Sequence, residues 1–321
     1  MYEQTKQYLQ QMADMKIFPS AKVCFFSDET EEILSYGQSV NDNSLFDLAS
    51  LTKVIGTTTV VLQLIEQHKL LLTDYVCSYL NIKNKKLQIE HLLTHTSDFQ
   101  GYIPNRNKLN ANELKTALLQ DIQSGIDLGQ KVKYSDINFL YLGWIVEKIT
   151  KRTIQQVIED EVLDKLPPNN FTFMPPKSLC MPTENYLQGI VHDPKAQILQ
   201  TNCGSAGLFG TLFDVLIFAK DYLENNTLLL SSTIQRLNRV YTPINEQSRS
   251  LGWVYDNNNL THTGYTGTYL SINLESREIF IFLSNRVCPV DNKEKYILHR
   301  DRLIKIYHSE QNATKYLLNN I

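Results

Sequence analysis

Four short segments near the C-terminal end of the chain alternate apolar and polar residues, as strands with one buried face do. Their tight links favour pairing between sequence neighbours, which gives an antiparallel meander. Two further strand candidates, 21–27 and 33–37, lie near the N-terminus with a turn between them. The four C-terminal segments are 253–255, 260–264, 268–274 and 279–284.

The chain between these strands has a mostly helical pattern. Residues 54–68 form an apolar helix that is expected in a core, and residues 139–150 form a strongly amphipathic helix. The two ends, 2–15 and 292–321, are also predicted to be helical, and prolines between 166 and 182 predict loops. Other helical segments are predicted at 113–124, 204–222 and 231–240.

These patterns predict an α+β protein in which an antiparallel sheet is flanked by the terminal helices. The sheet subdomain is expected to span about 1–54 and 205–321, and a helical subdomain about 55–204. A chain of 321 residues with 42% apolar residues is long enough to bury such a core.

Charge and composition narrow the class of protein. The net charge of −3 and the scattered basic residues disfavour nucleic acid as a partner. The polar, periodic residues 1–16 lack the apolar core of a signal peptide, and no later run is long enough to span a membrane. Five widely spaced cysteines without a C-x-x-C motif indicate buried, reduced thiols. A cytoplasmic protein is therefore expected, with a trimmed export segment as the alternative.

Ser50 and Lys53 form an S-x-x-K tetrad directly before the apolar helix. Positions three apart share one helix face, so the lysine amine can reach the serine hydroxyl. A partly desolvated lysine can share the work of activating that hydroxyl as a nucleophile. The helix N-terminus adds free N–H groups where an oxyanion would form. By itself the tetrad also fits a solvated helix start.

Two later stretches add chemistry-bearing side chains. Tyr134-Ser135-Asp136 precedes the amphipathic helix, and His262-Thr263-Gly264 ends a predicted strand. Tyr134 has an alternative interpretation as an aromatic residue at a helix entry with Ser135 as the N-cap. His262 is either an exposed strand residue or a group whose charge changes near neutral pH.

Other histidines and cysteines are better explained as structural residues. His91 and His95 have a spacing that can bind zinc, but Leu92 replaces the glutamate of H-E-x-x-H, so no metal is expected. His192 and Asp193 could join a serine triad, yet Cys203 occupies the first glycine position of the G-x-S-x-G elbow. Asn138 could supply an amide that Asp136 lacks, but only along a different backbone path. Cys24 and Cys203 are expected in the core.

Taken in order, the three stretches resemble the active-site motifs of the class C β-lactamase and penicillin-binding protein superfamily. The resemblance implies a single β-lactamase/transpeptidase-like domain with its active site in the cleft between the sheet and the helical subdomain. Five shorter stretches support it: 91–97, 191–194, 206–209, 251–253 and 284–286.

The resemblance also assigns roles to residues. Ser50 would be the nucleophile, and Lys53 and Tyr134 would share the general-base and general-acid work, without metal or organic cofactor. Thr263 and Gly264 would line the sheet edge beside the substrate. The backbone N–H groups of Ser50 and Tyr265 would form the oxyanion hole.

Two departures from the motifs bear on the substrate. The second motif often ends in Asn but here ends in Asp136, and the third often begins with Lys but here begins with His262. An added anion and a lost fixed cation should weaken recognition of a substrate carboxylate. The sequence therefore predicts a serine hydrolase that acts on small-molecule or peptide esters or amides and only weakly on β-lactams. A DD-peptidase-like protein and a non-catalytic binding or sensor module are the alternatives.

Overall fold

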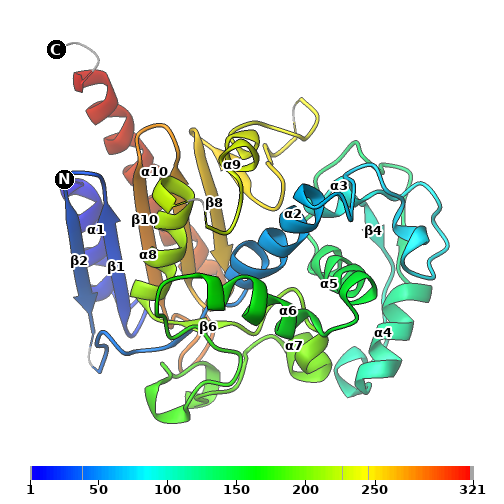
Figure 1. Cartoon of the computed structure of the whole chain (residues 1–321). Helices are drawn as coiled ribbons and strands as arrows, with labels where there is room; N and C mark the ends of the chain where they lie inside the picture. Colours follow the sequence, from blue (N-terminus) through cyan, green and yellow to red (C-terminus); the bar gives the residue numbers. More distant parts are fainter. Residues whose placement is uncertain (1, 38, 226, 245, 319–321) are drawn as a thin grey trace.

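A six-stranded antiparallel sheet with the order β2-β1-β10-β9-β8-β7 forms the centre of the molecule (Figure 1). The computed structural model of the chain describes residues 2–37, 39–225, 227–244 and 246–318. The expected meander is confirmed, because the four C-terminal strands pair in sequence order. The strands are β1 (Ala21–Phe26), β2 (Glu31–Tyr36), β7 (Val254–Asp256), β8 (Asn259–Gly264), β9 (Thr268–Asn273) and β10 (Glu278–Ser284).

The first strand joins the two ends of the chain. β1 lies antiparallel to β10, with Ala21 opposite Ser284 and Phe26 opposite Ile279. The N-terminal hairpin thereby extends the C-terminal meander into one sheet, since β1 also pairs with β2.

The alternation of side chains along the strands divides the core into two layers. Val23 and Phe25 of β1 pack on one face with the terminal helices α1 (Glu3–Asp14) and α10 (Lys293–Leu318). On the opposite face, Cys24 and the Ile and Leu residues of β10 belong to the larger core, against which α8 (Leu212–Lys220) packs. Helices therefore cover both faces of the sheet (Figure 1).

The helical part lies beside the sheet (Figure 1) and is built around α5 (Ile137–Thr150), nine of whose residues are buried. The remaining helices of this part are α2 (Thr59–Glu66), α3 (Ile89–Leu93), α4 (Ala111–Gln120), α6 (Ile154–Glu161) and α7 (Pro194–Leu199); α9 (Ser231–Leu237) follows α8. Two small two-stranded sheets complete the fold: β3 (Phe46–Asp47) with β6 (Phe209–Gly210), and β4 (Phe99–Gln100) with β5 (Gln123–Ser124).

Several predicted boundaries are corrected by local hydrogen bonding. The helix expected over 204–222 begins only at Leu212, because Thr211 and Asp214 form a capping box there. The segment 204–210 instead passes through β6. The apolar helix after Ser50 begins with a π-helical turn, η1 (Lys53–Thr58), before α2. The division into two subdomains stays a prediction.

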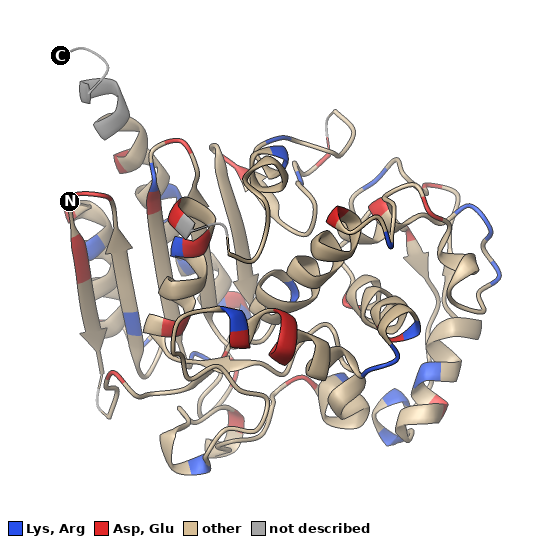
Figure 2. Cartoon of the chain, viewed as in Figure 1, with Lys and Arg blue, Asp and Glu red and all other residues tan. Residues whose placement is uncertain are grey.

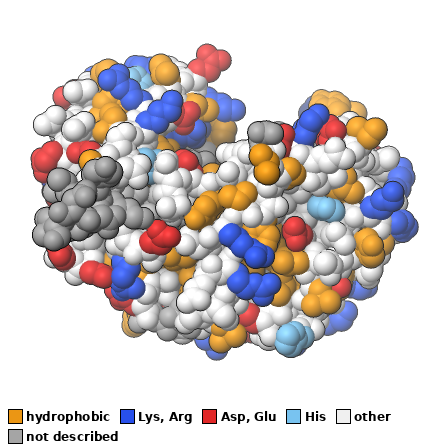
Figure 3. All heavy atoms as spheres, turned by 90° about the horizontal axis from the view of Figure 1, so that it is seen from above, with side chains coloured by type: hydrophobic (Ala, Val, Ile, Leu, Met, Phe, Trp, Pro, Cys, Tyr) orange, Lys and Arg blue, Asp and Glu red, His pale blue; other side chains and the backbone are white. Residues whose placement is uncertain are grey.

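Positive and negative side chains alternate over the described part of the chain (Figure 2). Lysine, arginine, aspartate and glutamate residues are interspersed along the chain (Figure 2), and the face in Figure 3 mixes charged and apolar side chains. Among the described residues, none of the helices combines the length and apolar character needed to cross a bilayer. The expected cytoplasmic location and the exclusion of nucleic acid stay predictions.

Phe280 is the aromatic centre of the layer beneath the terminal helices, and it is fully buried. Its ring stacks on Phe25 at 4.9 Å and lies 4.6 Å from the Tyr307 ring. We expect Phe280→Ala to lower the free energy of unfolding by about 3–5 kcal/mol, because it removes these contacts and leaves a cavity. Urea unfolding measures this change.

Leu298→Ala is the control for this prediction, since that side chain is exposed on α10. Its effect should stay within about 0.5 kcal/mol. Equal losses in the two variants would contradict the assignment of Phe280 to the core.

Candidate active site

Ser50 lies in a tight turn between β3 and the helix that starts the helical part. The preceding residue, Ala49, has a φ of 46°, a left-handed conformation that is strained for a residue with a Cβ. The buried carboxylate of Asp47 holds this turn by accepting the N–H of Ala49 at 2.9 Å and that of His192 at 2.7 Å. Burial raises the pKa of Asp47 to about 6.

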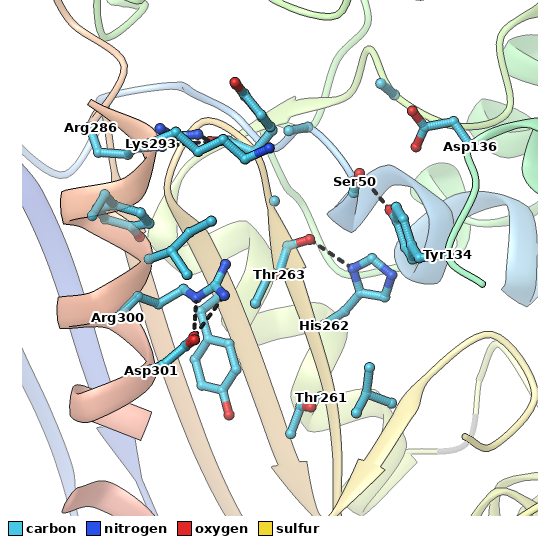
Figure 4. Close-up of a pocket in the computed structure, with 18 of the residues that line it drawn as sticks. Ser50, Tyr134, Asp136, Thr261, His262, Thr263, Arg286, Lys293, Arg300 and Asp301 are labelled. Atoms are coloured by element: carbon cyan, nitrogen blue, oxygen red, sulfur yellow. Dashed lines mark hydrogen bonds and ion pairs between the residues drawn. The ribbon is translucent and has the colours of Figure 1, made fainter. Parts of the chain in front are cut away.

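Two side chains converge on the Ser50 hydroxyl. Lys53 Nζ lies 2.8 Å from Ser50 Oγ, and the Tyr134 hydroxyl lies 3.0 Å from it. Figure 4 shows Ser50 and Tyr134 pointing toward one another. Ser50 and Tyr134 are 84 positions apart in the sequence. They meet because the segment that leads into α5 lies beside the start of the π-helical turn.

Lys53 is buried, and its ammonium is held by acceptors on two sides. Its Nζ donates to the Ser205 carbonyl at 2.8 Å and forms an ion pair with Asp136 Oδ1 at 2.8 Å. Burial by itself lowers the pKa of Lys53, but the charges of Asp136 and Tyr134 outweigh burial and hold that pKa above its usual range. The sequence-based expectation that Asp136 favours the ammonium form therefore agrees with the geometry.

Asp136 contacts a second lysine that sequence reasoning missed. Its Oδ2 lies 3.0 Å from Lys195 Nζ, which also pairs with Asp193 at 2.9 Å. Burial raises the pKa of Asp136, yet the two lysines outweigh burial and hold it well below its usual range. Asp136 is therefore an anion between two cations.

The edge of β8 lies against the turn that precedes Ser50. A Cβ on Gly264 would lie 2.0 Å from Thr268 Oγ1 and 2.7 Å from the Leu48 carbonyl oxygen, so no other residue fits there. Among the described residues, no acceptor takes the backbone N–H of Ser50 or of Tyr265. The assignment of these two donors to an oxyanion hole stays a prediction.

His262 differs from both interpretations that the sequence allowed. It is 2% exposed rather than an exposed strand residue, and its Nδ1 lies 3.0 Å from the Thr263 carbonyl oxygen. Burial, helped by the charges of Lys53 and Arg249, lowers the pKa of His262 to about 3. The prediction that its charge changes near neutral pH is therefore wrong, because the imidazole is neutral there.

Arg249 supplies a fixed positive charge that the motifs do not reveal. It is 3% exposed, and its guanidinium lies 5.5 Å from the centroid of the Tyr134 ring. Its Nη2 donates to Gln247 at 3.2 Å, whereas Nε and Nη1 have no partner among the described residues. Burial lowers its pKa to about 10, which leaves it charged at neutral pH. A lone arginine before Leu251-Gly252-Trp253 carries no signal in the sequence.

The remaining histidines and Asn138 make contacts with neighbouring residues of the fold. His95 is buried against the Tyr134 ring at 4.5 Å and contacts Asn138 Nδ2 at 2.9 Å, so Asn138 supports His95 rather than Lys53. His91 Nδ1 accepts the N–H of Gln88. His192 stacks on Tyr265. The part of the chain that the structure describes contains no cluster of metal-ligating side chains.

Several of these groups line one cavity of about 910 Å³. It continues past β8 to α10, where Lys293, Arg300 and Asp301 line its other wall (Figure 4). The predicted site residues along it are Ser50, Tyr134, Asp136, His262, Thr263, Gly264 and Tyr265.

An antiparallel sheet with a serine, lysine and tyrosine at the cleft beside it is the arrangement of serine hydrolases of the penicillin-recognising type. The family model described as Beta-lactamase matches residues 5–303, and the chain belongs to that family. The predicted superfamily and the predicted α+β fold are both confirmed.

Individual relatives support the same conclusion. A protein of Salmonella typhi named putative D-alanyl-D-alanine carboxypeptidase is 27% identical over 81% of this chain and 74% of its own length. A class C β-lactamase structure matches with a TM-score of 0.76 at 17% identity, over 94% of both chains. EstCE1, described as a hydrolase with promiscuous acyltransferase activity, matches with a TM-score of 0.75 at 17% identity, over 94% of this chain and 97% of that one. The two structures establish the shared fold.

Asp47 gives a pH-dependent prediction. Because its pKa in the folded protein, about 6, lies above the ordinary value of about 3.9, the folded state binds this proton more tightly than the unfolded chain does. The stability that this proton contributes is complete below about pH 4 and is lost as the pH rises through about 6. Relative to Asp47→Asn, the wild type should lose about 3 kcal/mol of unfolding free energy across that range.

Urea unfolding of both proteins at a series of pH values measures this difference. Asp14→Asn, which removes an exposed carboxylate at the end of α1, controls for the loss of a charge as such. A wild-type advantage that grows with pH would contradict the prediction.

Proposed function

We propose that the protein is a serine hydrolase that forms an acyl-enzyme on Ser50 and acts on ester or amide carbonyls. The observation that carries the proposal is the convergence of Lys53 Nζ and the Tyr134 hydroxyl on Ser50 Oγ, at 2.8 and 3.0 Å, inside a large cavity. Membership of the β-lactamase family supports the same chemistry.

Tyr134 is the proposed route for the proton in the acylation step. Ser50 Oγ attacks the substrate carbonyl carbon, and its proton passes through the Tyr134 hydroxyl toward the leaving group. Lys53 is unsuited as the acceptor, because the ion pair with Asp136 keeps it protonated. The ammonium of Lys53 and the guanidinium of Arg249 lie 5.4 and 5.5 Å from the centroid of the Tyr134 ring, so two positive charges lie beside the group that relays the proton. Tyr134 then protonates the leaving group.

The backbone N–H groups of Ser50 and Tyr265 are the proposed oxyanion donors. Each such donor is typically worth about 3 kcal/mol of barrier. The reverse proton path through Tyr134 would activate the water that hydrolyses the acyl-enzyme. Asp47 contributes by fixing the turn that aims the Ser50 N–H.

The motif positions favour substrates without a carboxylate beside the scissile bond. His262 is neutral where a lysine often stands, and Asp136 adds an anion. We therefore propose weak action on β-lactams that carry such a carboxylate, and better action on uncharged esters or amides.

Arg249 favours a second candidate, a DD-peptidase-like activity on peptides with a C-terminal carboxylate. Arg249 lines the cleft, and among the described residues its Nε and Nη1 have no hydrogen-bond partner, so its guanidinium is the cation proposed to pair with a substrate carboxylate. The relatives named putative D-alanyl-D-alanine carboxypeptidase support this candidate. A binding or sensor module that uses the same pocket without turnover is the third candidate.

Ser50→Ala tests the nucleophile. Hydrolysis of p-nitrophenyl butyrate by the wild type should show a burst of p-nitrophenol, and the variant should lose at least about 10³-fold in kcat/KM. Stopped-flow absorbance measures both. Ser35→Ala, on the exposed face of β2, should match the wild type. Equal rates in Ser50→Ala and wild type would rule out the proposed nucleophile, and binding without turnover would favour the sensor module.

Arg249→Gln separates the first two candidates. If Arg249 binds a substrate carboxylate, KM for diacetyl-Lys-D-Ala-D-Ala should rise about tenfold more than KM for p-nitrophenyl butyrate, since a charge-assisted pair is lost only with the peptide. Steady-state kinetics on both substrates measures the difference. Arg239→Gln is the matched control, because that arginine stacks on Tyr241 as Arg249 does on Tyr134. No turnover of the peptide by the wild type would exclude the second candidate.

A further inference from the structure

Four charges of alternating sign form a line across the cleft. Lys53 Nζ pairs with Asp136 Oδ1 at 2.8 Å, Asp136 Oδ2 with Lys195 Nζ at 3.0 Å, and Lys195 Nζ with Asp193 Oδ2 at 2.9 Å. The line starts at the amine that contacts the Ser50 hydroxyl. The first part of it was expected from the sequence, whereas the two residues at its far end come from a separate segment.

Lys195 is fixed in place by the helix on which it stands. Asp193 caps α7 by accepting the backbone N–H groups of Lys195 and Ala196 through Oδ1, at 2.8 and 2.9 Å. The other oxygen of the same carboxylate accepts the Lys195 ammonium. The lysine side chain is only 10% exposed, so it is a held charge and not a mobile surface lysine.

Lys195 lies where it compensates the negative charge that Asp136 adds to the site. An asparagine at that position would be neutral, whereas Asp136 places a negative charge beside the nucleophile. Lys53 neutralises one of its oxygens, and without Lys195 the other would face the cleft with no cation against it. Removing one partner of a partly buried carboxylate is strongly destabilising, because its charge is then left uncompensated.

Both residues also face the space that a substrate would occupy. Asp136 and Lys195 line the 910 Å³ cavity and an adjoining cavity of about 520 Å³, whose wall includes Tyr102 and Arg106. Asp136 and Lys195 are therefore wall residues for a substrate group in either cavity. The sum of the two charges therefore acts on the substrate as well as on Lys53.

We propose that Lys195 is a positioning residue that neutralises the outer oxygen of Asp136, so that Asp136 orients the Lys53 ammonium toward Ser50 without repelling anionic substrate groups. This inference rests on the proposed function. Lys195 itself need not touch the reacting atoms, because it acts through Asp136.

The test uses kcat/KM for two esters that differ mainly in charge, p-nitrophenyl butyrate and mono-p-nitrophenyl glutarate. Lys195→Gln should lower kcat/KM about ten- to a hundredfold, the range that coupled charges in contact produce, and more for the anionic glutarate. Lys195→Arg keeps the charge and should stay within about threefold of the wild type. Lys220→Gln is the matched control, because Lys220 makes an ion pair with Glu31 away from the cleft.

If Lys195→Gln alone fails to fold, the same substitution is tested in a protein that already carries Asp136→Asn. With Asn at 136 there is no outer charge to neutralise, so adding Lys195→Gln should change kcat/KM less than about threefold. A further tenfold fall there, or wild-type rates in Lys195→Gln on both esters, would overturn the inference. Equal losses on the two esters would overturn its claim about anionic groups.

The same measurements distinguish a failure of the proposed function from a failure of this inference. A wild type that lacks Ser50-dependent hydrolysis overturns that function and this inference with it. A wild type that hydrolyses both esters through Ser50 while Lys195 proves neutral overturns this inference alone.

Discussion

The close approach of β8 to the turn before Ser50 is the constraint on which the site depends. Thr266 Oγ1 donates to the Asp47 carbonyl oxygen at 2.6 Å, and Thr268 Oγ1 donates to that of Leu48 at 3.1 Å. Gly264 lies between these bonds, where a side chain has no room. Because the turn is thereby fastened to the sheet, the N–H groups of Ser50 and Tyr265 are set at a fixed separation before any substrate arrives. Such preorganised donors act on charge that develops in a transition state without further rearrangement.

The same fastening explains why a strained residue is tolerated beside the nucleophile. Ala49 has a left-handed backbone, which costs of order 1–3 kcal/mol unless the surroundings enforce it. Here the Asp47 carboxylate accepts the Ala49 N–H and also the His192 N–H, so one buried side chain joins the nucleophile turn to the loop that leads into α7. The helix that carries Lys195 is therefore linked to the turn before Ser50 by hydrogen bonds as well as by charge.

Local pattern was sufficient for the strands and for the Ser50–Lys53 pair, and insufficient for their partners. Period-two alternation identified β8 and β10, and a spacing of three predicted the contact that Lys53 makes with Ser50. The burial of His262 was not predictable in the same way, because both faces of β8 are covered and alternation then gives no inside or outside. Capping boxes determine where helices begin. At Thr211 such a box starts the helix at Leu212, whereas the apolar pattern alone predicted a start at 204.

Arg249 and Lys195 show why motif letters alone give the wrong charge for a cleft. Read in isolation, Asp136 and His262 remove positive charge from the neighbourhood of Ser50. In three dimensions, Lys195 lies 3.0 Å from Asp136, and the Arg249 guanidinium lies 5.5 Å from the centroid of the Tyr134 ring. Both cations come from segments 59 or more residues away from Asp136 in the sequence, and they meet the motifs only because the fold brings α7 and the segment before β7 to the same cavity. Coulombic energy depends on separation and burial and not on chain order. The charge that a substrate meets is therefore a property of the packed cleft, and its preference for anionic or neutral groups depends on where these two cations sit.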